Sequence, residues 1–302
     1  MTLSVSTFGL FNSVLGNAKS VQQALSLASI QQSTGLVGTD FASYGSKSQQ
    51  LLNMQTEINQ TQTYSDLTSL ASDRSQASFT AIGNMIDRIT DLRSAIGAAL
   101  NGDDDTTVTG AAQSILSDLG DQMNAQLNGR YLFAGSQTDS PPVDLSNYPA
   151  TLPPSTTTPD LSFYQGDDQI SSVRISSTES VNYGVTGDNS AFELALRSAA
   201  VVANVTTTPL DTATLKTALD MANQALNSLS NLQATVSVGA NSLKSAQQDQ
   251  ASYITLLTNA TTNIKNVDAA EALSNVTQLT TQLQASYSAL SNVMKIKLTD
   301  FL

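Results

Sequence analysis

Residues 273–301, LSNVTQLTTQLQASYSALSNVMKIKLTDF, contain the pattern that decides the fold. Steps of three and four residues alternate through them for four heptads, which is the spacing of a seam on an α-helix. The seam consists of Leu273, Val276, Thr280, Leu283, Tyr287, Leu290, Met294, Lys297 and Phe301. The C-terminal region is therefore predicted to form one long helix that packs along another helix.

The helical surface around this seam carries almost no charge, and the N-terminal region shares this property. No charged residue lies between Glu271 and Lys295, and Lys19 is the only one between Met1 and Val37. A free coiled coil normally flanks its seam with charges, whereas these positions hold Gln, Ser, Thr and Asn. We interpret both ends as helices buried on several sides within an assembly, where unpaired charges would be costly to desolvate. The alternative is ordinary bundle helices in a chain rich in Ser and Thr.

Two more helices are predicted before the middle of the chain. The first follows heptad spacing through Phe79, Ile82, Ile86, Ile89, Ile96 and Leu100, with Arg93 as the one polar member. It ends at Asn101-Gly102 and the Asp cluster 103–105, which together favour a turn and a new helix start. The second helix runs through Ala112, Leu116, Leu119, Met123 and Leu127 and stops at Asn128-Gly129. We expect these two helices to form a hairpin.

The segment 135–190 differs in composition from the rest of the chain. It holds six of the seven prolines, which do not fit helix interiors, and about half of the net negative charge. Short β-type runs lie around Val173 and around Val181 to Val185, bounded by Gly, Asp and Ser. Helical patterns resume over 192–205 and again from about residue 211. We interpret 135–190 as a small β-rich insert exposed to solvent.

The predicted fold class is mainly α with a small β insert, in which the N-terminal and C-terminal halves form a long antiparallel helical bundle or coiled coil. Three parts are expected. Residues 1–40 with 264–302 form a terminal coiled-coil region, 41–134 with 191–263 form a helical bundle domain, and 135–190 form the exposed β-rich domain.

Composition excludes most catalytic chemistry. The 302 residues include neither Cys nor His, so a thiolate nucleophile, a His base and a Cys or His zinc site are impossible. The Asp cluster 103–105 abuts a helix start, and Gly166-Asp167-Asp168 is typical of a turn. Neither has the spacing of a calcium loop. We therefore predict that the protein is not an enzyme and has no catalytic residues, no metal site and no cofactor.

The charge balance and the hydrophobic pattern limit the partners. A net charge of −12 argues against nucleic-acid binding, which depends on Lys and Arg that neutralise phosphates. No apolar run reaches the length of a membrane-spanning helix, so no membrane contact is expected. The first basic residue is Lys19, whereas a secretory signal peptide opens with positive charge. A cytosolic protein and one exported by a dedicated machine both remain open at this point.

Local motifs in the same order along the chain resemble the flagellin superfamily, and within it the hook-associated proteins of the hook–filament junction. The motifs are Ser33-Thr34-Gly35, the run 128–135 (NGRYLFAG), 164–168 (YQGDD), 184–188 (GVTGD) and 283–287 (LQASY). The run 128–135 is similar to an element that distinguishes junction proteins from filament flagellin. The segment 36–40 (LVGTD) departs from the family, because it lacks the basic residue and the Asp pair that usually follow Ser-Thr-Gly.

The resemblance implies an extracellular structural protein of the bacterial flagellum with a role in motility. It implies type III export without a cleaved signal peptide, and self-association in a ring between hook and filament. The implied partners are an adjacent hook-associated protein, flagellin, and an export chaperone that binds the C-terminal region. The main alternative is a filament flagellin, a bulk polymer subunit. A secreted enzyme on a helical scaffold and a free-standing helical adhesin are further alternatives.

The expected assembly interface consists of apolar side chains of the terminal helices. Burial of such side chains supplies adhesion at about 25 cal/mol per Å². The predicted interface residues are Phe8, Phe11, Val14, Leu25, Ile30, Leu273, Val276, Leu283, Tyr287, Leu290, Met294 and Phe301.

Overall fold

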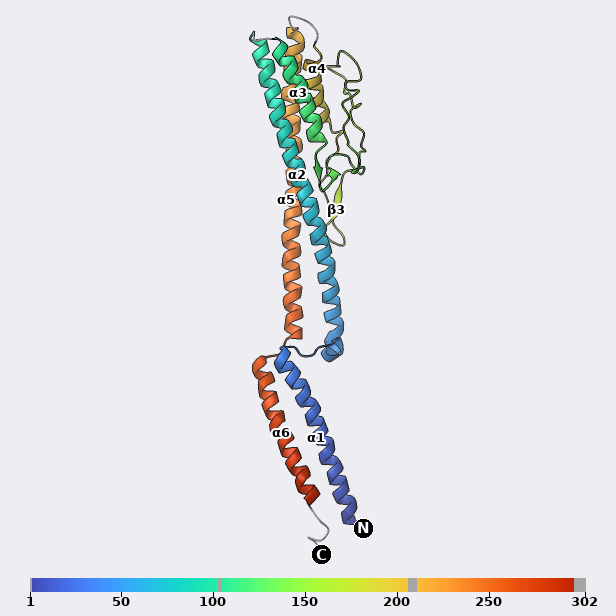
Figure 1. Cartoon of the computed structure of the whole chain (residues 1–302), viewed down its shortest axis with the longest axis vertical. Helices are drawn as coiled ribbons and strands as arrows, with labels where there is room; N and C mark the ends of the chain where they lie inside the picture. Colours follow the sequence, from blue (N-terminus) through green and yellow to red (C-terminus); the bar gives the residue numbers. More distant parts are fainter. Residues whose placement is uncertain (1, 103–104, 206–210, 296–302) are drawn as a thin grey trace. The chain divides into compact units, whose positions relative to one another are not determined.

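A computed structural model describes residues 2–102, 105–205 and 211–295 (Figure 1). Its α-helices are α1 (Thr2–Thr34), α2 (Ser48–Leu100), α3 (Asp105–Met123), α4 (Ser190–Ala203), α5 (Thr212–Lys265) and α6 (Ala269–Lys295), and a 3-10 helix, η1, spans Phe41–Lys47. The strands pair as two short hairpins: β1 (Gln126–Leu127) with β2 (Arg130–Tyr131), and β3 (Ser172–Arg174) with β4 (Ser180–Asn182). The predicted class, mainly α with a small β insert, is confirmed.

The chain divides into two compact units. Unit 1 comprises residues 1–60 and 253–302, and unit 2 comprises residues 61–252. The boundary falls within the two longest helices, α2 and α5, so each of these helices contributes to both units. The predicted division into three parts stays a prediction. None of the helices in the described ranges combines the length and apolar character needed to cross a bilayer.

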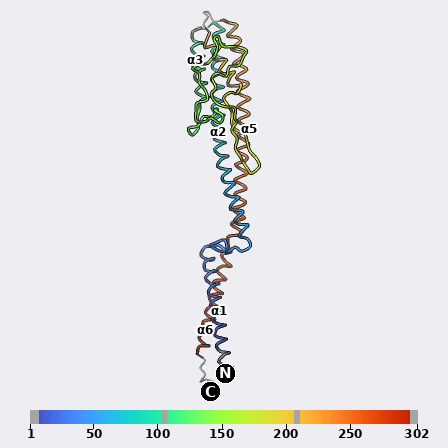
Figure 2. The backbone as a smooth tube through the Cα atoms, turned by 90° about the vertical axis from the view of Figure 1, so that its right-hand side faces the viewer, coloured from blue at the N-terminus to red at the C-terminus, as the bar shows by residue number. Residues whose placement is uncertain are grey.

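Unit 1 is built around two helices from opposite ends of the chain. Helices α1 and α6 lie side by side in both views (Figures 1 and 2). Their connecting segments are joined by backbone hydrogen bonds, from Val37 N to the Lys265 carbonyl at 2.8 Å and from Val267 N to the Gly35 carbonyl at 2.9 Å. Because α1 ends and α6 begins at this junction, the two helices run antiparallel.

Unit 2 contains the main hydrophobic core. Helices α2 and α5 run antiparallel within it, as shown by hydrogen bonds from Ser75 Oγ to the Val236 carbonyl (3.4 Å) and from Gln233 Nε2 to the Phe79 carbonyl (3.2 Å). The buried seam of α2 alternates steps of three and four residues and consists of Ile82, Met85, Ile89, Leu92 and Ile96. Arg93 from the predicted pattern is exposed, so the helix buries a neighbouring stripe through Met85 and Leu92 instead.

Helix α3 ends earlier than the sequence pattern predicted. It stops at Met123, and Asn128-Gly129 forms the tight turn of the β1–β2 hairpin rather than the end of a helix. Both turn residues have positive φ, 53° at Asn128 and 74° at Gly129, as expected for the Asn-Gly turns that match the twist of a hairpin. Leu127 therefore lies in a strand, and the prediction that the helix continues through it is wrong.

The insert contains little regular strand. Outside the β3–β4 hairpin, most of residues 132–189 form loops and turns, with one isolated bridge between Val143 and Tyr164. These loops nevertheless have a core, because Phe133 and Phe163 are fully buried with Phe192 of α4. The ring of Phe133 meets that of Phe192 edge to face, at 5.2 Å between centroids. Apolar anchors thus hold the insert on the helices where strand pairing is scarce.

Candidate assembly interface

Helix α6 has two apolar sides in unit 1. The less exposed positions, which α1 covers, follow alternating steps of four and three residues: Ala272, Val276, Leu279, Leu283, Ser286, Leu290 and Val293. The remaining described residues of the predicted interface on α6 lie fourteen and seven residues apart, on one stripe of the helix, and they are exposed: Leu273 at 53%, Tyr287 at 50% and Met294 at 69%. A helix with a single partner needs only one such seam. The second stripe of α6 is apolar surface that unit 1 leaves in contact with solvent.

Helix α1 shows the same division. Phe11, Val14 and Leu25 are half-buried, on the stripe that also buries Ala18 and Ala28. Two other predicted residues, Phe8 and Ile30, are exposed, as are Leu10 and Leu27, which the prediction did not include. These exposed side chains spread over several sides of the helix. Phe301, the last predicted residue, lies outside the described residues.

The residue types explain why the helices form and yet bury so little. Both have helical hydrophobic spacing, but the fully covered positions in the pair are mostly alanines, namely Ala18, Ala28 and Ala272. Small side chains let two helices approach closely, and they remove little apolar surface from water. The larger apolar side chains of the terminal helices remain half-buried or exposed.

Three of the five motifs that carry the family resemblance, the runs 128–135, 164–168 and 184–188, meet in one place in unit 2. The Tyr164 hydroxyl, from the run 164–168, lies 2.7 Å from the Asp167 carbonyl and 3.1 Å from the Phe133 carbonyl, so its one proton is shared between these two acceptors. A Cβ at Gly187, from the run 184–188, would lie 2.7 Å from the Tyr164 ring. Burial and the charge of Asp188 raise the pKa of Tyr164 to about 12, so the phenol stays protonated and donates. The three motifs are thus parts of one packed cluster.

Asp167 has a structural role in the same cluster. Its carboxylate accepts hydrogen bonds from the hydroxyl and the backbone N–H of Ser136 and from Gln169 N. These donors, the Ser136 hydroxyl first, hold the pKa of Asp167 below its usual value. No group of carboxylates suited to a metal ion is found in residues 2–102, 105–205 and 211–295. Of the other Asp cluster, residues 103 and 104 lie outside these ranges.

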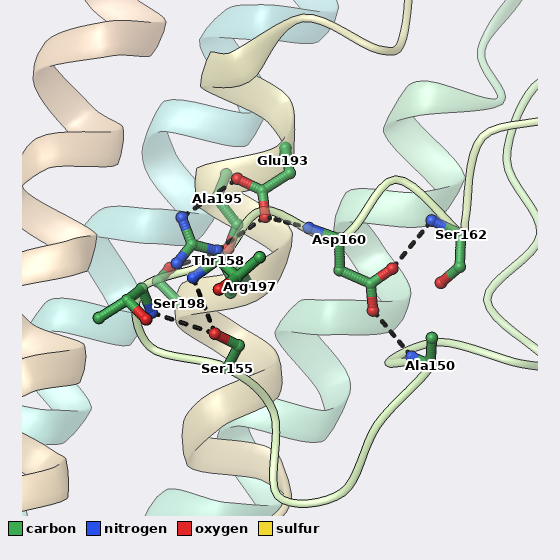
Figure 3. A network of polar contacts seen from close by, with 10 residues as sticks. Ala150, Ser155, Thr158, Asp160, Ser162, Glu193, Ala195, Arg197 and Ser198 are labelled. Atoms are coloured by element: carbon green, nitrogen blue, oxygen red, sulfur yellow. Dashed lines mark hydrogen bonds and ion pairs between the residues drawn. The ribbon is translucent and has the colours of Figure 1, made fainter.

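A buried ion pair, which the sequence analysis did not single out, fastens the proline-rich loop to α4 (Figure 3). Glu193 and Arg197 are 3% and 8% exposed, and their Oε1 and Nε atoms lie 2.7 Å apart. Glu193 Oε1 also accepts from Asp160 N at 3.0 Å, and the Asp160 carboxylate accepts from Ala150 N and Ser162 N. Opposite charges four residues apart in the otherwise apolar helix 190–203 are a sequence signal for such a pair.

A second buried polar contact ties the β3–β4 hairpin to the long helices. Gln250 of α5 donates from Nε2 to Thr68 Oγ1 of α2 at 3.3 Å and to the Ile175 carbonyl at 2.8 Å. One amide thus joins three segments that are far apart in sequence.

Comparison with known families agrees with this architecture. The bacterial flagellin N-terminal helical region matches residues 5–138, and the bacterial flagellin C-terminal helical region matches residues 219–302. The N-terminal match contains nearly all of α1 with α2 and α3, and the C-terminal match contains most of α5 with α6. The two matches leave out most of the insert and all of α4. No curated protein sequence matches the chain.

Solved structures share the fold at low sequence identity. FlgL of Bacillus cereus is 15% identical, with 70% of this chain and 98% of that chain covered and a TM-score of 0.57. The flagellar hook-associated protein-3 of Legionella pneumophila is 14% identical, with 70% and 98% covered and a TM-score of 0.55. A Vibrio parahaemolyticus protein assigned to the flagellar hook-associated proteins is 14% identical, with 72% and 97% covered and a TM-score of 0.57.

Proposed function

The chain belongs to the flagellin family, and we propose that it is a structural subunit of the bacterial flagellum that joins hook and filament. The observation that carries the proposal is the unpartnered apolar surface of α1 and α6 in a chain of this family. Leu273, Tyr287 and Met294 form that surface on α6, and Phe8 and Ile30 contribute to it on α1. A subunit of a polymer needs such a surface, and a free-standing protein does not.

The proposed mechanism is mechanical. The half-buried seam between α1 and α6 holds the helix pair together, and the exposed stripes bind neighbouring subunits. Each Å² of apolar surface removed from water contributes about 25 cal/mol, so the adhesion grows with the number of neighbours on each helix. The near absence of charge on these helices fits burial on several sides, because no ion has to be desolvated. The predicted interface residues, Phe301 included, keep this role as a proposal.

A filament flagellin is the less favoured alternative. Both would use the same terminal helices, so the interface does not separate them. The three solved structures of similar fold are hook-associated proteins or assigned to them, which supports the junction. The cluster formed by the run 128–135 with Tyr164 and Gly187 also supports it, because that run resembles the junction-protein element.

Export and location follow from the same proposal. As a flagellar component the protein would act outside the cell, after type III export without a cleaved signal peptide. Its proposed partners are further copies in a ring, an adjacent hook-associated protein, flagellin, and a chaperone bound to the C-terminal region. No catalytic role is proposed. The proteins of this family are structural, and the Asp167 carboxylate is occupied by hydrogen bonds within its own loop cluster.

Immunogold electron microscopy of intact cells tests the proposal, with an antibody against residues 135–190. The expected result is a single band of label where hook and filament meet. Label along the whole filament would make the protein a flagellin. Label absent from flagella would overturn a flagellar role altogether.

A further inference from the structure

Unit 2 has a groove with two arginines that lack carboxylate partners. The groove, of about 400 Å³, lies between α2 and the two β hairpins, and it is lined by Leu70, Arg74, Leu127, Arg130 and Tyr183 among others. The ion pairs in the described part of the chain use Arg88 and Arg197, so neither Arg74 nor Arg130 has an acidic partner there.

Both arginines are held in place and keep free donors. Arg74 Nη2 donates to the Tyr131 carbonyl at 3.0 Å, and Arg130 Nε donates to Thr138 Oγ1 at 2.8 Å. A guanidinium has five N–H donors, so most donors on each side chain stay available. Leu70, 47% exposed on α2, adds an apolar patch beside the charges. The groove is therefore suited to carboxylates presented on a protein surface.

The same unit has an acidic groove at a different place on α2. That groove, of about 340 Å³ between α2 and α3, is lined by Asn84, Asp87, Arg88, Asp118, Asp121 and Gln122. Arg88 pairs with Asp91 at 3.3 Å and Asp118 at 3.7 Å. Asp87 and Asp121 are exposed, and neither belongs to an ion pair within the ranges described.

We propose that the Arg74–Arg130 groove of one copy binds the Asp87–Asp121 groove of the next copy. The inference rests on the proposed function, because a closed ring of identical chains needs two different and complementary surfaces on each chain. Copies that each carry a net charge of −12 repel one another, so a contact between them needs concentrated positive charge on one side. The basic groove supplies that charge. Complementary charges also fix the register of such a contact.

Charge reversal tests the pairing on the full-length chain. Asp87→Lys/Asp121→Lys changes only exposed side chains, so folding is preserved, and the matched control Asp220→Lys/Asp249→Lys alters the net charge equally at exposed sites of α5. The acidic-groove variant, and Arg74→Glu/Arg130→Glu, should each reduce association between copies by at least roughly tenfold, and the control should not. All four groove substitutions in one chain should restore association, since the charges are then complementary again. Far-UV circular dichroism checks that each variant is folded.

Cross-linking gives the readout, because the chain has no cysteine of its own. Leu70→Cys places a thiol in the basic groove and Asn84→Cys places one in the acidic groove, so the doubly substituted chain should form intermolecular ladders. Either single variant should give almost none. The ladders should fade as salt shortens the Debye length from about 10 Å at 0.1 M to about 3 Å at 1 M.

The outcomes separate this inference from the proposed function. Three results together support the pairing. The wild-type protein labels the junction, the label is lost when either groove is reversed, and the fourfold variant restores it. Normal assembly of Asp87→Lys/Asp121→Lys, or no rescue by the fourfold variant, overturns the pairing while the junction role stands. The pairing is also overturned if only the reversal of the basic groove reduces assembly, because the groove then binds another acidic protein. Wild-type label away from the junction refutes the proposed function, and the ladders then test the pairing by themselves.

Discussion

Units 1 and 2 share helical spacing and similar residue types, and they differ in where their aromatic side chains lie. In unit 2, Phe133, Phe163 and Phe192 are fully buried, together with the seam of α2 and with Leu215, Leu229 and Leu243 of α5. In unit 1, Phe8 is 67% exposed and Phe41 is 43% exposed. Unit 2 thus buries large aromatic and aliphatic side chains in its own core, whereas unit 1 leaves several of its large apolar side chains exposed; on the proposed function, other subunits cover them.

The largest effect is expected on incorporation into flagella, because the exposed apolar side chains of unit 1 form the proposed interface. Tyr287→Asp puts a carboxylate on the exposed stripe of α6, so the isolated chain should keep its helical content. In the assembly the same charge would be desolvated without a partner, and incorporation into flagella should drop by at least roughly tenfold. Gln284→Asp, at an exposed position outside both seams, is the matched control and should retain more incorporation. Normal incorporation of Tyr287→Asp would remove the stripe from the interface.

Phenylalanine truncation tests the contrast in the isolated chain. Phe163→Ala should lower the free energy of unfolding of unit 2 by about 3–5 kcal/mol, because it leaves a cavity in a fully buried site. Phe8→Ala removes the same atoms from an exposed site in unit 1, and it should change the free energy of unfolding of the chain by less than about 0.5 kcal/mol. Urea unfolding followed by far-UV circular dichroism measures both values. Equal losses from the two variants would mean that the units do not differ in burial in solution.

The buried ion pair of α4 tests whether the insert belongs to the folded core of unit 2. Glu193→Gln removes a carboxylate that accepts hydrogen bonds from Arg197 and Asp160 N, and it should cost about 1.5–3 kcal/mol, the range for hydrogen bonds to charged groups. The control is Asp91→Asn in the Arg88–Asp91 pair, where both side chains are about half exposed and the loss should stay below about 1 kcal/mol. If the two variants lose equal stability, the buried pair does not hold the insert.

Helix content and fold class followed from the sequence, because apolar residues spaced three and four apart lie on one face of an α-helix. The seam between α1 and α6 was only partly predicted. Its buried members, Ala18, Ala28 and Ala272, are small, and alanine carries little signal in a hydrophobic pattern. Larger side chains such as Tyr287 are exposed, on a side of the helix outside the pair. The stripe read from the sequence therefore combined the inner seam with the outer surface.

The insert was the least predictable region for a different reason. Its loops are held by side chain to backbone hydrogen bonds, such as those from Ala150 N and Ser162 N to Asp160, and such bonds leave no periodic signal. The Asn128-Gly129 pair was ambiguous, because the same dipeptide ends helices and closes hairpins. Which of these occurs depends on the strands that flank it, and here each strand has only two residues.

The smallest expected effect concerns acid stability, where each unit has an Asp with similar bonding. Ser136 donors lower the pKa of Asp167 in unit 2, and Ser43 donors lower that of Asp40 in unit 1. A lowered pKa means that the ionised carboxylate stabilises the folded state; this stabilisation is complete above the unfolded value of about 3.8 and is lost as the pH falls through the folded value.

Asp167→Asn should therefore reduce stability at pH 7 and flatten its decline in acid. Asp40→Asn should leave the acid unfolding curve unchanged, because unit 1 contributes little to cooperative unfolding before assembly. Circular dichroism across the acid range measures both curves. A flattened curve for Asp40→Asn would show that unit 1 is already cooperatively folded in the isolated chain.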